Sequence, residues 1–103
     1  MPKHEVELTE EAKADLDEYT AFERKMLTEE IRVQLGDQPS VETKNRKKLR
    51  ENPVAPWELR AGRHRVFYEV DESSQKVTII AVGHKEHHLL LIRGREVRPL
   101  PSG

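Results

Sequence analysis

The stretch LRAGRHRVFYEV, Leu59–Val70, decides the fold, because its second half alternates between two sets of side chains. Successive residues of a β-strand point to opposite faces of the sheet. One face would receive the apolar set Val66, Tyr68 and Val70, and the other would receive Arg65, Phe67 and Glu69. The alternation therefore predicts a strand with one face on a core and an arginine on the opposite, more open face.

Two further strands are expected beside this one, since short apolar runs lie on either side of turn residues. They are Trp57–Arg60, ahead of a turn at Ala61-Gly62, and Lys76–Val82, which Gly83 would end. Trp57 is interpreted as a core residue at the start of its strand. These segments predict an antiparallel meander of three strands. Beyond it, Leu89–Ile92, a tight turn at Arg93-Gly94 and Arg95–Arg98 predict a small C-terminal hairpin.

The N-terminal third carries one strand pattern and two helix signals. His4–Leu8 alternates as a short strand, and Thr9 can cap a helix that follows it. Thr20 and Glu23 have the spacing of a capping box, which places a second helix start after a tight joint. Gly36 would cap its C-terminus. We favour a helical hairpin over one bent helix, followed by a loop over residues 36–56 with a helical turn around Lys44–Arg50.

The predicted architecture is α+β, with the N-terminal strand and the helical hairpin packed on one face of a small antiparallel sheet. A chain of 103 residues has room for a single domain over 1–103, with residues 89–103 as a C-terminal strand or hairpin extension. The absence of cysteine excludes disulfides, thiolate metal sites and thiol nucleophiles. No apolar run reaches the ~18 residues of a membrane span, and a cytoplasmic protein without a membrane partner is expected.

Charge is unevenly distributed along the chain, although the net charge is only −1. Residues 1–30 hold ten acids against four bases, and most of the basic residues follow. Such a molecule can present a basic face to a polyanion, and arginine is suited to phosphate because its planar fork bonds two oxygens at once. Besides Arg65, the candidate phosphate- or RNA-binding residues are Lys44, Arg46, Lys47, Lys48, Arg50, Arg60 and Arg63, together with Phe67 as a base-stacking candidate. A charged surface that only keeps the protein soluble is the alternative for the 44–50 cluster.

Three histidines gather in His84-Lys85-Glu86-His87-His88. A metal site is disfavoured, because the segment has no helical pattern and no second ligand cluster. General acid–base chemistry by His84 or His88 is the favoured functional interpretation, since histidine titrates near neutral pH. Exposed loop histidines without a chemical role are the alternative.

Taken in order, LRAGRHRVFYEV, the preceding Lys48-Leu49-Arg50 and the later Ile80-Ala81-Val82-Gly83-His84-Lys85 closely resemble the RelE/ParE superfamily of type II toxin–antitoxin toxins. The resemblance spans roughly residues 5–88. It implies a small toxin neutralised by a cognate antitoxin protein. In the RelE branch the toxin cuts mRNA on the ribosome without a metal or other cofactor, and in the ParE branch it inhibits DNA gyrase.

The resemblance also implies roles for individual residues. Arg65 matches the central-strand arginine that stabilises the phosphate, and Lys85 stands where a second basic residue follows the glycine. Two features of the RelE branch are missing, because its lysine pair would fall near Pro56 and Glu58 and its late tyrosine at about Leu91. His84, His87 or His88 could replace the tyrosine as proton donor. The expected function is a ribosome-dependent mRNA endonuclease, and the alternative is a gyrase inhibitor or a catalytically degenerate binding protein of the same fold.

Overall fold

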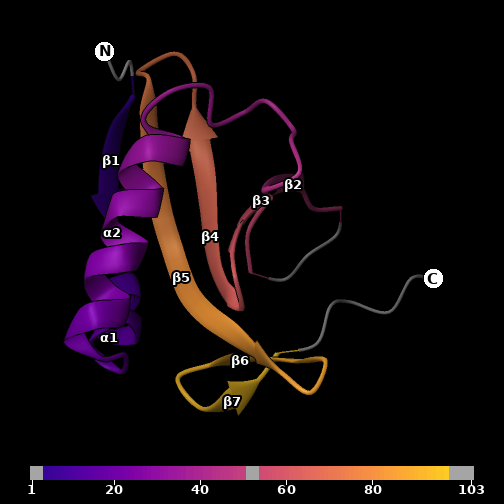
Figure 1. Cartoon of the computed structure of the whole chain (residues 1–103). Helices are drawn as coiled ribbons and strands as arrows, with labels where there is room; N and C mark the ends of the chain where they lie inside the picture. The colour runs from indigo at the N-terminus through magenta and orange to yellow at the C-terminus, as the bar shows by residue number, and fades with distance from the viewer. Residues whose placement is uncertain (1–3, 51–53, 98–103) are drawn as a thin grey trace.

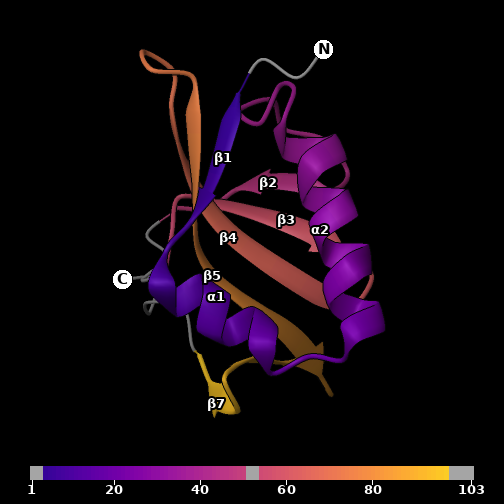
Figure 2. The ribbon, with the colours of Figure 1, turned by 90° about the vertical axis from the view of Figure 1, so that its left-hand side faces the viewer.

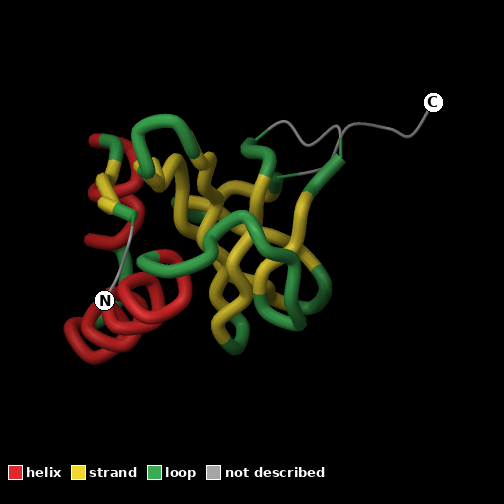
Figure 3. The backbone as a smooth tube through the Cα atoms, turned by 90° about the horizontal axis from the view of Figure 1, so that it is seen from above, coloured by secondary structure: helices red, strands yellow, loops and turns green. Residues whose placement is uncertain are grey.

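The computed structural model describes residues 4–50 and 54–97 and shows two layers, two helices against one face of a seven-stranded sheet (Figures 1 and 2). The elements in chain order are β1 (Glu5–Leu8), α1 (Glu10–Asp17), α2 (Ala21–Leu35), β2 (Arg46–Lys48), β3 (Trp57–Ala61), β4 (His64–Asp71), β5 (Lys76–Glu86), β6 (Leu89–Ile92) and β7 (Arg95–Glu96). The layers are also distinct from above, where the helices lie to one side of the strands (Figure 3). The predicted α+β architecture is confirmed.

Both helices begin where the sequence predicts. The Thr9 hydroxyl accepts a hydrogen bond from the Ala12 backbone N–H, and Thr20 forms a complete capping box with Glu23. Because only three residues separate the helices, α1 turns sharply into α2 and the two run in different directions across the sheet (Figure 2). Gly36 ends α2, as expected.

The sheet is built around β5, its longest strand. Its strand order is β2-β3-β4-β5-β6-β7, and the neighbours on this path are antiparallel. The first half of β5 also pairs with β1, in parallel, along the edge that β6 occupies further on. Between these two partners the edge is closed by α1 and its cap, since the Asp15 carboxylate accepts from Val82 N–H at 2.9 Å and Thr9 Oγ1 donates to the Ile80 carbonyl at 3.2 Å.

The main core lies between the helices and the sheet. Leu27, Ile31 and Leu35 of α2 belong to the same buried cluster as the strand residues Leu59, Val66, Tyr68, Val77, Ile79 and Val82. Val66 and Tyr68 are fully buried and Val70 is partly buried, so the predicted inward face of β4 is confirmed. Trp57 is a core residue as expected, 8% exposed and stacked on Tyr68 with ring centroids 6.0 Å apart.

The opposite face of the sheet is less open than the alternation suggested. Phe67 is fully buried in a second cluster with Ala55, Ala81 and Ile92, where residues before β3 and the β6–β7 hairpin pack on the sheet. The prediction that Phe67 is exposed for base stacking is therefore wrong. The alternating pattern gives the direction of this side chain but says nothing of the loop and hairpin that cover it.

Two predicted boundaries also need correction. The basic residues 44–50 form no helical turn, because Arg46–Lys48 pair with β3 as strand β2. Gly83 does not end β5, which continues to Glu86. Glycine is required at 83 by close packing, since a Cβ there would lie 2.4 Å from the Leu91 carbonyl oxygen. The Arg93-Gly94 turn forms with positive φ at both residues, whereas Arg98, the predicted end of the last strand, lies outside the described residues.

Candidate functional site

Neighbouring residues at the start of β4 point to opposite faces of the sheet. His64 is 5% exposed on the helix side, and Arg65 is only partly buried on the other side, which we call the open face. The antiparallel register carries this division into β3 and β5. Arg65 lies opposite Arg60 and Gly83, whereas His64 lies opposite Ala61 and His84. The predicted site residues are thus divided between two surfaces.

Arg60 and Arg65 form a cross-strand pair of like charges on the open face. Like charges directly opposite each other in a sheet repel, so this pair lowers the stability of the fold. Glu58, two residues before Arg60 and 7% exposed, offsets part of that repulsion. Its Oε1 accepts from Arg60 Nε at 2.8 Å. The alternation of Trp57–Arg60 could have placed Glu58 beside Arg60, but the carboxylate was not singled out from the sequence.

The Arg65 guanidinium is held in place by backbone carbonyls. Its Nη1 donates to Gly62 O at 2.7 Å and to His64 O at 2.9 Å. Its Nε is buried and has no hydrogen-bond partner in the part of the chain that the structure describes. Burial lowers the pKa of Arg65 from its usual value, Glu58 raises it by a smaller amount, and the like charge of Arg60 lowers it further. The result is a cation held at a fixed position on the open face, and guanidinium groups suit phosphate oxygens.

Two lysines extend the basic surface around this pair. Lys47 lies opposite Glu58 in the register of β2 and β3, and Lys85, two residues after Gly83, is exposed on the same face. We define the open-face cluster as Lys47, Glu58, Arg60, Arg65 and Lys85. It draws on four strands, β2 to β5, and holds four cations and one carboxylate.

The other candidate cations do not join the open-face cluster. Arg46 is 8% exposed on the helix side, where its side chain donates to Val41 O and Gln34 O. Arg63 turns to α2 and donates to Glu23 at 3.3 Å. Lys48 lies opposite the core residue Trp57. Lys44 and Arg50 are exposed and lie outside the described strands.

On the helix side, polar residues form what we call the helix–sheet network: Asp15, Tyr19 and Glu23 with Val82, His84 and His64. Tyr19 Oη lies 2.7 Å from His84 Nδ1, and Glu23 Oε2 lies 2.9 Å from His64 Nε2. The Tyr19 ring makes edge contacts with both imidazoles, with centroids 5.2 Å and 5.5 Å apart. His84, a candidate proton donor, is therefore engaged on the face opposite to Arg65.

The network also shifts two acidic groups in opposite directions. Burial raises the pKa of Tyr19 to about 12, so this phenol stays protonated. Hydrogen bonds from the Thr20 backbone and from His64 lower the pKa of Glu23 to about 2. Both groups are held in the state that completes their hydrogen bonds, which is typical of a structural network.

His87 and His88 form the exposed turn between β5 and β6, and both have positive φ. They lie beyond the end of β5, four and five residues after Gly83, the residue opposite Arg65. Among the described residues, no group of three histidine or acidic side chains is arranged to hold a metal ion. Nor is any described helix long and apolar enough to cross a membrane.

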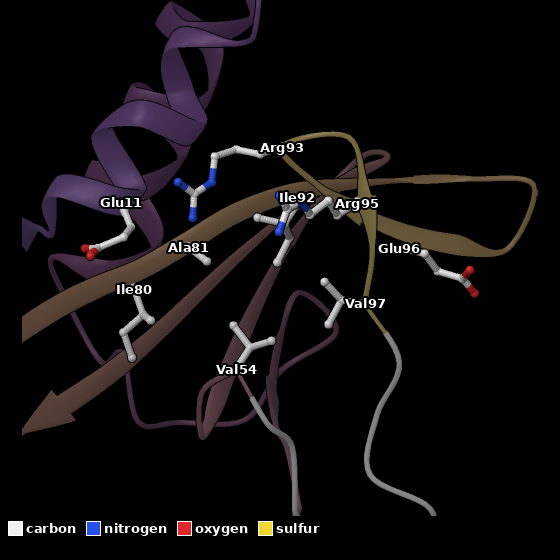
Figure 4. Close-up of a pocket in the computed structure, with 9 residues that line it drawn as sticks. All are labelled: Glu11, Val54, Ile80, Ala81, Ile92, Arg93, Arg95, Glu96 and Val97. Atoms are coloured by element: carbon white, nitrogen blue, oxygen red, sulfur yellow. The ribbon is translucent and has the colours of Figure 1, made fainter.

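Beside the second core cluster lies a cavity of about 690 Å³ (Figure 4). Apolar residues from three segments line it, namely Val54, Ile80, Ala81, Ile92 and Val97. Arg93 and Arg95 of the β6–β7 hairpin stand at its rim with Glu11 of α1. Glu96 also lines the cavity, so its charged lining holds two arginines and two glutamates, and the hollow is suited to an apolar side chain.

Comparisons with known proteins agree with this architecture. The family model described as "ParE toxin of type II toxin-antitoxin system, parDE" matches residues 6–89. Among solved structures, the RelBE2 toxin–antitoxin complex of Mycobacterium tuberculosis contains a chain with a TM-score of 0.72 and 25% identity, covering 82% of this chain and 94% of that one. In the RelE–RelB complex of Pyrococcus horikoshii a chain has a TM-score of 0.66 and 18% identity, covering 82% and 98%. No curated protein matches significantly.

Proposed function

The chain belongs to the ParE toxin family of type II toxin–antitoxin systems, within the RelE/ParE superfamily, and from this premise we propose that it is a ribosome-dependent mRNA endonuclease that inhibits translation in the cytoplasm. The observation that carries the proposal is the open-face cluster. Fixed cations directed at one surface are what stabilisation of an RNA phosphate in its transition state requires. Arg65 would bind the scissile phosphate, with Arg60 and Lys85 beside it.

No metal has a part in the proposed reaction. The 2′-hydroxyl of the RNA is itself the nucleophile, and the charge that develops on the phosphate is neutralised by guanidinium and ammonium groups. Because Lys47, Arg60, Arg65 and Lys85 come from four paired strands, the sheet fixes their spacing before the substrate arrives. Such preorganisation is the main contribution that a small protein can make to this chemistry.

A second function, inhibition of DNA gyrase, is favoured by two specific observations. The matching family model is that of ParE, and His84 is bound to Tyr19 on the helix side and not beside Arg65. A toxin of this kind needs only a binding surface, and the open-face cluster would then contact the target enzyme without cutting RNA.

We also propose a cognate antitoxin as the partner that neutralises the toxin. The two similar solved structures are toxin–antitoxin complexes. In this chain the apolar cavity beside the β6–β7 hairpin would receive an apolar side chain of the antitoxin. A helix or extended stretch seated there would continue over the open face and cover Arg65.

The decisive experiment presents the purified toxin with both targets. One reaction holds ribosomes stalled on a defined mRNA, and the other holds gyrase with relaxed plasmid and ATP. Cuts within the codon in the ribosomal A site, absent with Arg65→Ala, would support the endonuclease. Intact mRNA together with blocked supercoiling would assign the gyrase function, and no effect in either reaction would contradict both.

A further inference from the structure

An endonuclease that uses the 2′-hydroxyl needs a group that removes its proton, and this group must lie on the same face as Arg65. The two tyrosines cannot supply it, because Tyr19 and Tyr68 are buried on the helix side and burial raises the pKa of each. His64 and His84 are excluded for the same reason of position, since both belong to the helix–sheet network. His87 and His88 lie in the turn beyond the end of β5, so we look for the proton acceptor within the open-face cluster, next to Arg65.

That cluster contains one carboxylate, Glu58. We propose that Glu58 is the general base of the reaction, an inference that rests on the endonuclease function proposed above. Glu58 and Arg60 share one face of β3, and Arg60 is paired directly with Arg65 on β4. The carboxylate is also close enough to influence the charge state of Arg65. A phosphate bound by Arg65 would therefore place its ribose near Glu58.

The surroundings of Glu58 suit a positioned base. Its side chain is 9% exposed, so few water molecules reach it, yet it is not sealed off. Arg60 binds Oε1 at 2.8 Å and fixes the plane of the carboxylate. Oε2 is then the oxygen directed to the substrate. A base held in one orientation is more effective than a mobile one, because the cost of alignment has already been met on folding.

The proposed step balances in atoms and charge. The proton of the 2′-hydroxyl passes to Oε2 of Glu58 while the 2′-oxygen forms a bond to phosphorus. The bond from phosphorus to the 5′-oxygen of the next nucleotide breaks, and that oxygen takes a proton from solvent. The products are a 2′,3′-cyclic phosphate and a 5′-hydroxyl. Glu58 then returns its proton to solvent, while Arg65 and Lys85 neutralise the phosphate throughout.

The simpler interpretation is that Glu58 only offsets the repulsion between Arg60 and Arg65. The two interpretations differ for Glu58→Gln, which keeps the shape and the acceptor oxygen for Arg60 but removes the basic group. Glu58→Gln would remove both a countercharge and a base. Only the loss of a base would slow the chemical step and leave substrate binding intact.

The experiment measures single-turnover cleavage of mRNA on stalled ribosomes as a function of pH, together with toxin affinity for the same complex carrying a 2′-O-methyl nucleotide at the cut site. For Glu58→Gln we expect the cleavage rate to fall by about 10²–10⁴-fold with unchanged affinity. The rise of the rate with pH in the wild type should disappear. Glu58→Asp keeps a carboxylate on a shorter side chain and should recover part of the rate.

Glu69→Gln is the matched control, because Glu69 is an exposed carboxylate on the same face of β4 and should leave the rate unchanged. Wild-type cleavage by Glu58→Gln would overturn the assignment of the base and leave the endonuclease function standing. Weaker binding of the 2′-O-methyl complex in proportion to the loss of rate would also overturn it and leave Glu58 as a countercharge. Absence of cleavage by the wild type would instead contradict the endonuclease function itself.

Discussion

The two faces of the sheet around His64 and Arg65 both carry polar groups but differ in how these groups are paired. On the helix side, Asp15, Tyr19 and Glu23 each meet a partner on β5 or β4. On the open face, the four cations of the open-face cluster have one carboxylate among them, Glu58, which binds Arg60. Paired polar groups stabilise the fold, whereas unpaired charge at fixed positions costs stability and is typical of a site for an anionic ligand. The comparison predicts that substitutions on the two faces will affect different measurements.

The largest effect is expected from Arg65→Ala on the open face. Removing the fixed cation should reduce cleavage of ribosome-bound mRNA by about 10²–10³-fold, the usual cost of losing one preorganised donor to a transition state. Growth arrest on induction should be lost with it. The melting temperature should change little, because the relief of repulsion from Arg60 offsets the loss of the hydrogen bonds from Arg65 to Gly62 O and His64 O.

Arg32→Ala is the control for this substitution, since Arg32 is exposed on α2 and pairs only with Glu29 among the described residues. It should retain full toxicity. A toxic, cleaving Arg65→Ala variant would contradict the division of roles between the two faces.

On the helix side the largest loss of stability is expected from Asp15→Ala. Asp15 is 1% exposed, accepts from Val82 N–H, and has Arg93 Nε 2.7 Å from Oδ1 as an ion pair that is not aligned for a hydrogen bond. Burial raises the pKa of Asp15, against the lowering effects of Val82 and Arg93. Its removal leaves a buried N–H of β5 unsatisfied and should cost about 2 kcal/mol in the free energy of unfolding.

Denaturant unfolding would measure this loss of stability. The activity that depends on Arg65 should be nearly unchanged in the same variant. Asp17→Ala, an exposed aspartate of the same helix, should change the unfolding free energy little. An Asp15→Ala protein as stable as the Asp17→Ala protein would show that α1 does not close the edge of β5 through this carboxylate.

The sequence was sufficient for one half of this comparison. Alternation in β4 places Arg65 and Val66 on their faces, and threonines at helix starts place the helices. The helix–sheet network was not predicted, although Asp15, Tyr19 and Glu23 recur every four residues. That spacing crosses the break between two helices, so no single helical pattern reveals it. Each partner also lies over forty residues away in sequence, and such contacts depend on strand register.

The same limit explains the misplaced candidates. Arg46 and Lys47 are adjacent basic residues, and which of them reaches the open face depends on the pairing of β2 with β3. A helical turn over residues 44–50 would have allowed the basic side chains to gather, whereas a strand separates neighbours to opposite faces. His84 was likewise expected to act as a proton donor beside Arg65, because the sequence does not show that β5 continues beyond Gly83.

A smaller effect is expected from Tyr19→Phe. The change removes the hydroxyl that meets His84 Nδ1 at 2.7 Å but keeps the ring against both imidazoles. Losing one partly buried hydrogen bond should lower the free energy of unfolding by about 1 kcal/mol, measured in urea. For the endonuclease proposed above, cleavage by the variant should match the wild type, since His84 meets Tyr19 on the face opposite to Arg65. A fall in rate without a fall in stability would return His84 to the list of catalytic residues.

The smallest effect is expected from Glu23→Gln, and it depends on pH. In the folded protein the pKa of Glu23 is about 2, against an ordinary value of 4.5. Between these two pH values the unfolded chain binds a proton at this position and the folded protein does not. Acidification therefore favours unfolding there, and the contribution of Glu23 is fully present above pH 4.5 and is lost as the pH falls toward 2.

Glutamine at position 23 cannot titrate, so the variant should be less stable than the wild type at neutral pH and should lose less stability on acidification. Subtracting the two unfolding curves at each pH isolates this residue from the other carboxylates with lowered pKa, Glu29, Asp71 and Glu72. A difference that does not change between pH 5 and 2 would mean that His64 and the Thr20 cap do not hold the charged form of Glu23. Glu23 lies on the opposite side of the sheet from Arg65, so Glu23→Gln should leave the affinity for RNA at neutral pH unchanged. This single variant therefore separates the helix side from the open face.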